Sequence, residues 1–262
     1  MPRKRPPSKP ADPRAAPRDP AAVKRRPATE NSPPTSSAHP PTGASTRYSV
    51  IPPAVTASPL PATLLSLERY LAILPDALAS FPEAKVSGAI VRAFLADPRV
   101  ELPLDAGLPA AIEQLVRAPP ADDDWVPVVH FCALQAIVYD CVFAGRGGMV
   151  AFEAWTFERN LRLLRGPQYA ELVAVQNPEL LLMAYHARWS AFYRGCPLEV
   201  MEGGKSSLVL RLSYPPHSWP NLSRLALAEA FRAGLLVAGG KAPKVTAKEL
   251  SSRVARFDVA WL

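Results

Sequence analysis

The pattern of apolar residues predicts a series of helices between about residue 63 and residue 194. In the first, the apolar residues fall on one helical face (Leu64, Leu67, Tyr70, Leu71 and Leu74), and Thr63 can cap its start. Further helices are predicted over 84–97, 108–118, 126–143, 149–165, 167–175 and 178–194. The segment 126–143 is apolar on nearly every side, which predicts a buried central helix.

Local signals mark the two ends of the last of these helices. The Asn177 side chain can accept hydrogen bonds from free helical amides, and Pro178 needs no donor at the first helical position. Gly195 readily adopts the left-handed conformation that follows many helices, so it predicts the end.

After Gly195 the apolar period changes from helical to alternating. Leu208, Leu210 and Leu212 alternate with other residues, a similar run covers 198–201, and glycines lie between the two, which predicts a β-hairpin. Asn221 is predicted to cap a helix that ends near Ala238, and a second hairpin is predicted over 244–262. Helices followed by β-β-α-β-β indicate an α+β fold with an antiparallel sheet, in a single domain over 63–262.

The N-terminal segment differs in composition from the rest of the chain. Sixteen of the 31 prolines lie in residues 1–61, together with many Ser, Thr, Ala and basic residues. Proline blocks helix formation, and the segment has too little apolar surface to offset the entropy of ordering. We therefore predict that residues 1–60 form a disordered, Pro-rich basic tail.

The charge of the chain is concentrated in this tail. Residues 1–50 hold ten Lys or Arg and three Asp or Glu, which accounts for the whole net charge of +7, whereas residues 51–262 hold twenty of each sign. The predicted domain is therefore not a basic surface for nucleic acid. The tail can contact an anionic polymer through its clustered cations, which are Arg3, Lys4, Arg5, Lys24, Arg25 and Arg26.

Cysteine content and hydropathy indicate in which cellular compartment we expect the protein. Three cysteines without a Cys-x-x-Cys pair favour reduced thiols in a cytoplasmic protein over a disulfide framework. The basic start is not followed by the apolar stretch of a secretory signal, and no run of 18 apolar residues predicts a membrane span.

The sequence EGGKSS at 202–207 resembles the end of a phosphate-binding loop, but its context is wrong. The motif needs a glycine five residues before Gly204, where Glu199 stands, and a helix after the Lys-Ser pair, where an alternating strand is predicted. The glycines are better explained by the positive φ of a tight hairpin turn.

Other reactive residue types do not form a recognisable catalytic or metal site. His130 and His186 lie on apolar helices without metal-ligand spacing, which favours hydrogen-bonded core histidines. Asp122, Asp123 and Asp124 favour a solvated loop or a helix cap. The stripe of Arg159, Arg162 and Arg165 at helical spacing can bind an anion or an acidic helix, although a solvated face is favoured. No Gly-x-Ser-x-Gly motif is present, so we expect a protein that is not an enzyme.

Motifs spread over residues 83–262 resemble those of a paralogous protein family expanded in myxobacteria. They include VPVVHFCALQAIVYD, FEAWTFERNLRLLRGPQYAEL, LVLRLSYP and ARFDVAW. These motifs contain no catalytic signature, so this resemblance implies no activity.

The order of elements is also similar to the ligand-binding fold shared by haem–nitric-oxide domains, vinyl-4-reductase-type sensor domains and Golgi-transport subunits. That resemblance implies an apolar cavity between helices and sheet, or a dimer surface. The Tyr-x-Ser-x-Arg spacing of the haem branch is absent from YPPHSWPNLSR, and so is the cysteine cluster of some sensor domains. We therefore expect no haem or other cofactor and an apolar ligand.

Together these observations predict a non-enzymatic sensor or regulatory module that binds a small apolar ligand or a protein partner. A second copy of the chain can be that partner, which would give a homodimer. The candidate cavity residues are aromatic side chains of the predicted domain, namely Phe131, Tyr139, Trp155, Tyr185, Trp189, Phe192, Phe231 and Trp261. The alternative hypothesis is an adaptor that docks on nucleic acid or an acidic partner through its basic tail.

Overall fold

The computed structural model describes residues 64–262, except for residue 101 and residues 103–106. All of them belong to one compact unit of the chain, Thr56–Leu262. The predicted tail over residues 1–60, its six clustered cations and the predicted Thr63 cap lie outside the described residues.

The N-terminal part of the described chain is mainly helical, as predicted. Its helices are α1 (Leu65–Ala72), α2 (Gly88–Leu95), α3 (Ala110–Arg117), α4 (Val128–Val138) and α5 (Gly148–Leu164). All residues of α4 except His130 are buried, because its apolar side chains meet other elements on nearly every side. The prediction of a buried central helix is therefore confirmed, and the helix continues as a π-helical turn over Tyr139–Phe143.

The N-terminus of α1 is capped by a residue distant in the sequence. The Asp140 carboxylate Oδ2, in the π-helical turn, accepts hydrogen bonds from the backbone amides of Ser66 at 2.8 Å and Leu67 at 3.2 Å. A carboxylate satisfies free helical donors and also suits the positive end of the helix dipole. The π-helical turn thus fixes where α1 begins.

A small antiparallel sheet was missed by the sequence prediction. The strands β1 (Lys85–Ser87), β2 (Trp125–Pro127) and β3 (Tyr193–Arg194) pair in the order β2-β1-β3. The helices predicted over 84–97, 126–143 and 178–194 are therefore each wrong at one end, where the chain forms β1, β2 and β3. Each strand has two or three residues, so its extended conformation comes from pairing with distant segments and leaves no alternating pattern.

The segment between α5 and β3 contains three short helical turns and one longer helix. Pro167–Tyr169 forms a 3-10 turn, α6 covers Ala170–Val173, and α7 covers Pro178–Arg188. The Asn177 cap is confirmed, because its side chain accepts from the amides of Glu179 at 2.9 Å and Leu180 at 3.2 Å. The Trp189–Ala191 3-10 turn then leads to β3. Gly195 has the predicted positive φ of 70°, but it follows β3 and does not end the helix, because α7 already ends at Arg188.

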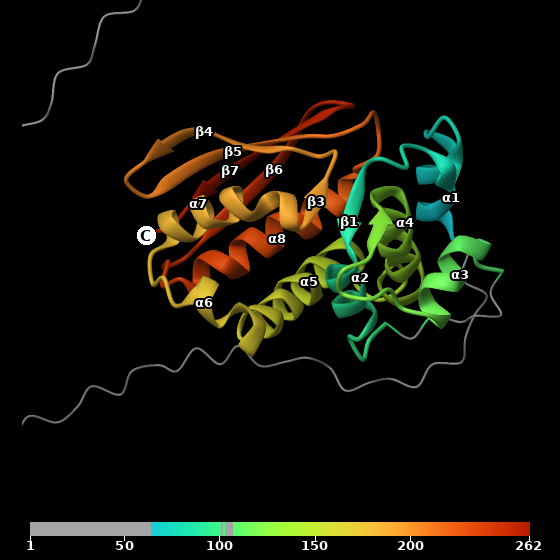
Figure 1. The fold of residues 1–262 in the computed structure, drawn as a ribbon, viewed down its shortest axis with the longest axis horizontal. Coiled ribbons are helices and arrows are strands. Elements are labelled where there is room, and N and C mark those ends of the chain that lie inside the picture. The colour runs from blue at the N-terminus through green and yellow to red at the C-terminus, as the bar shows by residue number, and fades with distance from the viewer. Residues whose placement is uncertain (1–63, 101, 103–106) are drawn as a thin grey trace, which may run out of the picture. The chain divides into compact units, whose positions relative to one another are not determined.

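The C-terminal part has the predicted β-β-α-β-β order, which confirms the α+β class. The strands β4 (Leu198–Gly204), β5 (Ser207–Ser213), β6 (Lys244–Ser251) and β7 (Val254–Ala260) form an antiparallel sheet in the order β4-β5-β7-β6. The helix α8 (Asn221–Val237) lies across one face of this sheet, next to α5 and α7 (Figure 1). Asn221 is the first residue of α8 and makes no side-chain cap, so that prediction is wrong.

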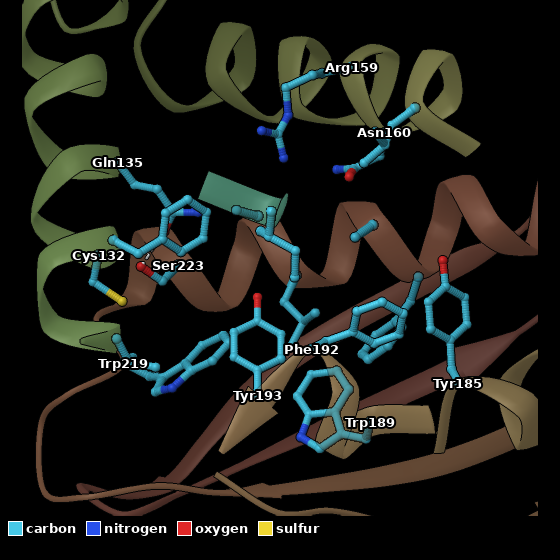
Figure 2. A pocket seen from close by; sticks show the side chains of 18 of the residues that line it. Cys132, Gln135, Arg159, Asn160, Tyr185, Trp189, Phe192, Tyr193, Trp219 and Ser223 are labelled. Atoms are coloured by element: carbon cyan, nitrogen blue, oxygen red, sulfur yellow. Dashed lines mark hydrogen bonds between the residues drawn. The ribbon is translucent and has the colours of Figure 1, made fainter. Parts of the chain in front are cut away.

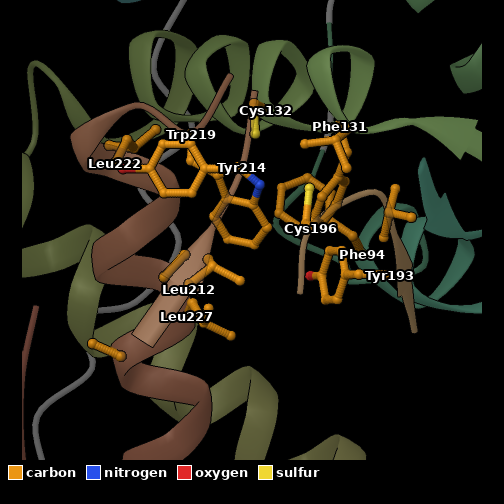
Figure 3. Packing of buried hydrophobic residues seen from close by; sticks show 14 of the residues in the cluster. Phe94, Phe131, Cys132, Tyr193, Cys196, Leu212, Tyr214, Trp219, Leu222 and Leu227 are labelled. Atoms are coloured by element: carbon orange, nitrogen blue, oxygen red, sulfur yellow. The ribbon is translucent and has the colours of Figure 1, made fainter. Parts of the chain in front are cut away.

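The two faces of the larger sheet differ in polarity. Leu208, Leu210 and Leu212 of β5 are buried, and the Phe257 ring on β7 packs edge-to-face on Phe231 of α8 at 5.4 Å. The opposite face carries ion pairs such as Arg256 with Asp258 at 2.6 Å. Figure 3 shows part of the core, which includes Leu212, Leu227, Tyr214 and Trp219, and the rings of the last two lie 6.2 Å apart.

The sequence EGGKSS lies at the tip of the first hairpin, where residues 202–204 end β4 and Ser207 is the first residue of β5. The prediction that no helix receives a phosphate here is confirmed. The explanation by positive φ is wrong, because Gly203 and Gly204 lie in β4 and are not among the residues with positive φ. A Cβ atom at Gly204 would lie 2.8 Å from Ser207 Oγ, a hydroxyl that can rotate away, so the structure does not explain why glycine stands there.

All three cysteines are free thiols, with Cys132 and Cys196 buried and Cys141 half-buried. In the part of the chain that the structure describes, no single helix is both long and apolar enough to cross a membrane. The pair Val128–Phe143 and Gly148–Leu164 meets the length and composition requirements only jointly, with a bend of 116° between its members.

We predict that Asp140→Ala lowers the free energy of unfolding by about 1 kcal/mol, because two amide donors of α1 lose their acceptor. For a domain of this size the loss corresponds to a fall in melting temperature of roughly 2–4 °C, which differential scanning calorimetry can measure. Asp123→Ala, in an exposed loop, is the matched control. Equal melting temperatures for both variants would show that Asp140 does not cap α1.

Candidate functional site

A cavity of about 100 Å³ lies between α4, α5, α8 and the segment that leads into β3 (Figure 2). Most of its wall is aromatic or aliphatic. The aromatic residues are Phe131, Tyr169, Tyr185, Trp189, Phe192, Tyr193, Trp219 and Phe231. The polar and charged residues are Gln135, Arg159, Asn160 and Ser223. This cavity is therefore an apolar chamber with a few polar groups, which is the usual composition of a small-ligand site.

The structure brings together five of the eight aromatic residues predicted from the sequence. The five that line the cavity are Phe131, Tyr185, Trp189, Phe192 and Phe231. The other three lie elsewhere: Tyr139 and Trp155 pack around Phe152 at 5.8 and 5.7 Å, and Trp261 is buried after the end of β7. Their spacing on apolar faces cannot separate a core position from a cavity wall, and a role in ligand contact stays a prediction for the five.

Two of the wall residues form an aromatic stack. The rings of Trp189 and Tyr193 lie 4.6 Å apart and nearly parallel, and Trp189 Nε1 donates a hydrogen bond to the Cys196 carbonyl oxygen at 2.6 Å. The 3-10 turn and strand β3 hold these residues in place. A second hollow of about 410 Å³ is lined by the same two residues together with exposed residues such as His186 and Arg194. The stack therefore contributes to the walls of both hollows.

The polar side chains on α4 and α8 bind each other at the cavity wall. Ser223 Oγ donates a hydrogen bond to Gln135 Oε1 at 2.6 Å. On α5, Asn160 Nδ2 donates to the Thr156 carbonyl oxygen at 2.8 Å. These bonds fix the orientation of the side chains and satisfy part of their hydrogen-bonding capacity.

The ionisable groups of the wall other than Arg159 are held in their neutral forms. Burial raises the pKa of the Cys132 thiol to about 12, so it is not a thiolate at neutral pH. Burial also raises the pKa of Tyr185 and of Tyr193. The wall thus offers no ready nucleophile from these residues.

Arg159 is the exception, and it contradicts the prediction of a solvated basic stripe. Residue Arg159 as a whole keeps some exposure, but its Nε and Nη1 atoms are buried and have no hydrogen-bond partner among the described residues. Its guanidinium carbon lies 4.9 Å from the centre of the Phe94 ring and 5.6 Å from that of Trp155. Burial lowers the pKa of Arg159 to about 10, so the group still carries its charge at neutral pH.

The nearby carboxylate of Asp97 is already occupied by other donors. Residue Asp97 is 7% exposed, and it accepts hydrogen bonds from Arg162 Nη2 at 2.5 Å, from Trp155 Nε1 at 3.2 Å and from the Arg99 amide at 3.1 Å. Burial alone would raise the pKa of Asp97, but these hydrogen bonds outweigh it and lower the pKa. Arg162 is thus a paired residue, and Arg165 is exposed.

The structure also shows the surroundings of the two histidines and the consecutive aspartates considered in the sequence. His130 Nε2 lies 3.1 Å from the Leu78 carbonyl oxygen, as expected for a core histidine, whereas His186 is exposed, so that prediction is wrong. Asp124 accepts from the Ala121 amide at 2.6 Å, and Asp122 pairs with Arg92 at 3.4 Å on the surface. Within residues 64–262, outside the gaps, no three His, Cys, Asp or Glu side chains gather as metal ligands do.

Comparison with known proteins yields a distant likeness in fold. No protein-family model matches the chain, and no curated protein matches its sequence. Two crystal structures of an H-NOX protein from K. algicida, both Fe(II) unliganded and one of them a mutant, are similar with a TM-score of 0.45. The identities are 8% for the mutant and 9% for the other, and each match covers 67% of this chain and 96% of that one. What the cavity binds must therefore be inferred from its own residues.

We predict that Asp97→Asn lowers the free energy of unfolding by about 2 kcal/mol at pH 7, because it weakens charge-assisted bonds that link the end of α2 to α5. The folded state lowers the pKa of Asp97, so its contribution is present above the unfolded pKa of about 3.9 and is lost as pH falls below it.

The difference between Asp97→Asn and the unmodified chain should therefore shrink below about pH 4. Chemical denaturation at pH 7 and at lower pH measures it. Asp123→Asn, exposed, is the control. A difference that stays constant with pH would show that the Asp97 charge does not stabilise the fold.

Proposed function

We propose that the domain is a sensor or regulatory module that binds a small, largely apolar ligand in the cavity between α4, α5 and α8. The observation that carries this proposal is the hollow itself, which measures about 100 Å³ and is walled mainly by aromatic side chains. Protein interiors are normally close-packed, so a hollow of this size leaves space for a ligand. An apolar ligand that fills it would gain free energy by moving its surface from water to the aromatic wall.

The chemistry of the wall favours binding over catalysis. Cys132 and Tyr193 are neutral, and Ser223 donates its proton to Gln135. Among the described residues, no histidine lines the cavity to act as a base for Ser223. On the motifs quoted from residues 83–262, we also propose membership in the paralogous family expanded in myxobacteria.

We predict that neutral apolar compounds of suitable size, such as toluene, benzyl alcohol and hexanol, raise the melting temperature of the full chain. A ligand present at 100 times its dissociation constant stabilises the folded state by about 2.7 kcal/mol. Differential scanning fluorimetry and calorimetric titration measure the effect, and native mass spectrometry of the purified chain tests whether it retains a ligand.

The matched variant for this experiment is Ala230→Leu, which adds carbon atoms at the cavity wall. It should weaken binding of all three compounds at least tenfold, because the added side chain takes up the space of the ligand. Ala154→Leu, on the exposed side of α5, is the control and should leave binding unchanged. Failure of every compound to stabilise the chain, with no retained ligand, would refute the proposal.

A second proposal concerns the N-terminal segment, and it is favoured by the location of the whole net charge of +7 in residues 1–50. We propose that this segment docks on nucleic acid or an acidic partner. Each Lys or Arg near an anionic surface contributes about 1 kcal/mol at most, so several must act together.

We predict that binding of the full chain to duplex DNA weakens steeply between 50 and 200 mM salt, because contacts with phosphate release counterions. Fluorescence anisotropy of labelled DNA measures the salt dependence. Deletion of residues 1–50 should abolish binding. Binding that survives the deletion would show that DNA contacts residues outside 1–50, and it would refute the proposal.

A further inference from the structure

The charges around the cavity do not balance. Two guanidinium groups, those of Arg159 and Arg162, lie near the single carboxylate of Asp97, and Arg162 is the one that pairs with it. Asp97 also accepts from Trp155 and from a backbone amide, so its oxygens are largely occupied. One positive charge therefore remains at the wall without a paired anion among the described residues.

The uncompensated charge lies at the cavity. Figure 2 shows the Arg159 guanidinium pointing away from α5 toward the group of aromatic side chains that line the hollow. The Phe94 and Trp155 rings attract the cation but accept no hydrogen bond in the plane of the guanidinium. Nε and Nη1 together carry three N–H donors that have no acceptor among the described residues.

Arg224 shows how this chain treats a buried guanidinium elsewhere. Its Nη1 donates to the Trp219 carbonyl oxygen and its Nη2 to Glu249, both at 2.6 Å. A buried cation is normally paired in this way, because an unpaired one loses its hydration without compensation. Arg159 differs in that its Nε and Nη1 have no acceptor among the described residues, which leaves these donors available to a bound ligand.

We propose that the cavity binds a small organic anion, a carboxylate that carries an aliphatic chain or an aromatic ring, with its charged end on Arg159 and its apolar body against the aromatic wall. This inference rests on the proposed function and adds the chemical class of the ligand. A planar carboxylate is the natural partner of a guanidinium, since it can accept two parallel hydrogen bonds. The remaining wall, including Phe131, Leu227 and Phe231, suits an apolar body.

Other kinds of ligand would satisfy either the charge of Arg159 or the apolar wall, but not both. Water or a neutral alcohol would accept hydrogen bonds from Arg159 but would not balance its charge. A small inorganic anion would balance the charge but would leave the apolar wall without a partner. The proposed ligand satisfies both requirements.

The test compares ligands that share an apolar body and differ in the head group, a charged carboxylate or a neutral alcohol, using calorimetric titration of the full chain. Benzoate should bind roughly 10- to 100-fold more tightly than benzyl alcohol, and hexanoate than hexanol, as expected for a charge-assisted hydrogen bond in a buried site. Along the series acetate, butyrate and hexanoate, affinity should rise up to about fourfold per added methylene.

Arg159→Met removes the guanidinium and keeps an unbranched side chain about as long as the arginine stem up to Nε. It should abolish the preference for the carboxylates while it retains binding of the alcohols. Arg165→Met, at the exposed end of the same helix, is the matched control and should keep the preference. If Arg159→Met does not fold, the Nε–H resonance of Arg159 in the unmodified chain gives a second readout, because benzoate should shift it more than benzyl alcohol does.

The outcomes separate this inference from the proposed function. Equal affinity for carboxylate and alcohol in the unmodified chain, or an unchanged preference in Arg159→Met, would refute the anion and leave an apolar site. Affinity that does not grow from acetate to hexanoate would indicate a site for small anions only and refute the apolar body. If neither class of compound binds, both proposals fail.

Discussion

The interaction on which the site depends most is the hydrogen-bonded group around Asp97. This carboxylate follows the end of α2, and it binds two side chains of α5, the Trp155 indole and the Arg162 guanidinium. It thereby fixes the rotation of α5 about its own axis. Because Trp155 and Arg162 face Asp97, the intervening Arg159 is carried inward and lies against Phe94 and Trp155. The charge at the cavity wall is therefore a consequence of how α5 is attached to α2.

The cavity itself follows from the packing of α8 between the larger sheet and the other helices. Phe231 packs on Phe257 on the sheet side, and Gly234 allows close approach of α7, since a Cβ atom there would lie 3.2 Å from Leu181 Cδ2. Side chains of α4, α5 and the segment that leads to β3 line the space that remains. The position of α8 at the cavity is thus fixed by its contacts with the sheet and with α7.

The sequence predicted the elements that carry their own periodicity. The buried helix α4, the Asn177 cap, the two hairpins and the β-β-α-β-β order all follow from local patterns, and the structure confirms them. It could not predict β1, whose three residues are extended only because β2 and β3 pair with them. Nor could it predict the Asp140 cap, because the carboxylate and its amides are 74 and 73 residues apart.

The same distinction applies to the site. Aromatic residues on apolar faces were recognised as candidates, but only the packing separates Phe192, which lines the cavity, from Tyr139, which does not. For Arg159 the local pattern was misleading. Three arginines at helical spacing resemble a solvated stripe, and the burial of one guanidinium depends on Asp97, which lies 62 residues earlier in the chain.

The stack of Trp189 and Tyr193 has an optical consequence. The indole of Trp189 borders both hollows, and Trp219 borders the inner one. The emission of an indole depends on the polarity of its immediate surroundings. The protein with and without a bound ligand should therefore differ in the wavelength and intensity of its tryptophan fluorescence. The chain therefore carries a built-in spectroscopic reporter, and no attached dye is needed to follow the inner chamber.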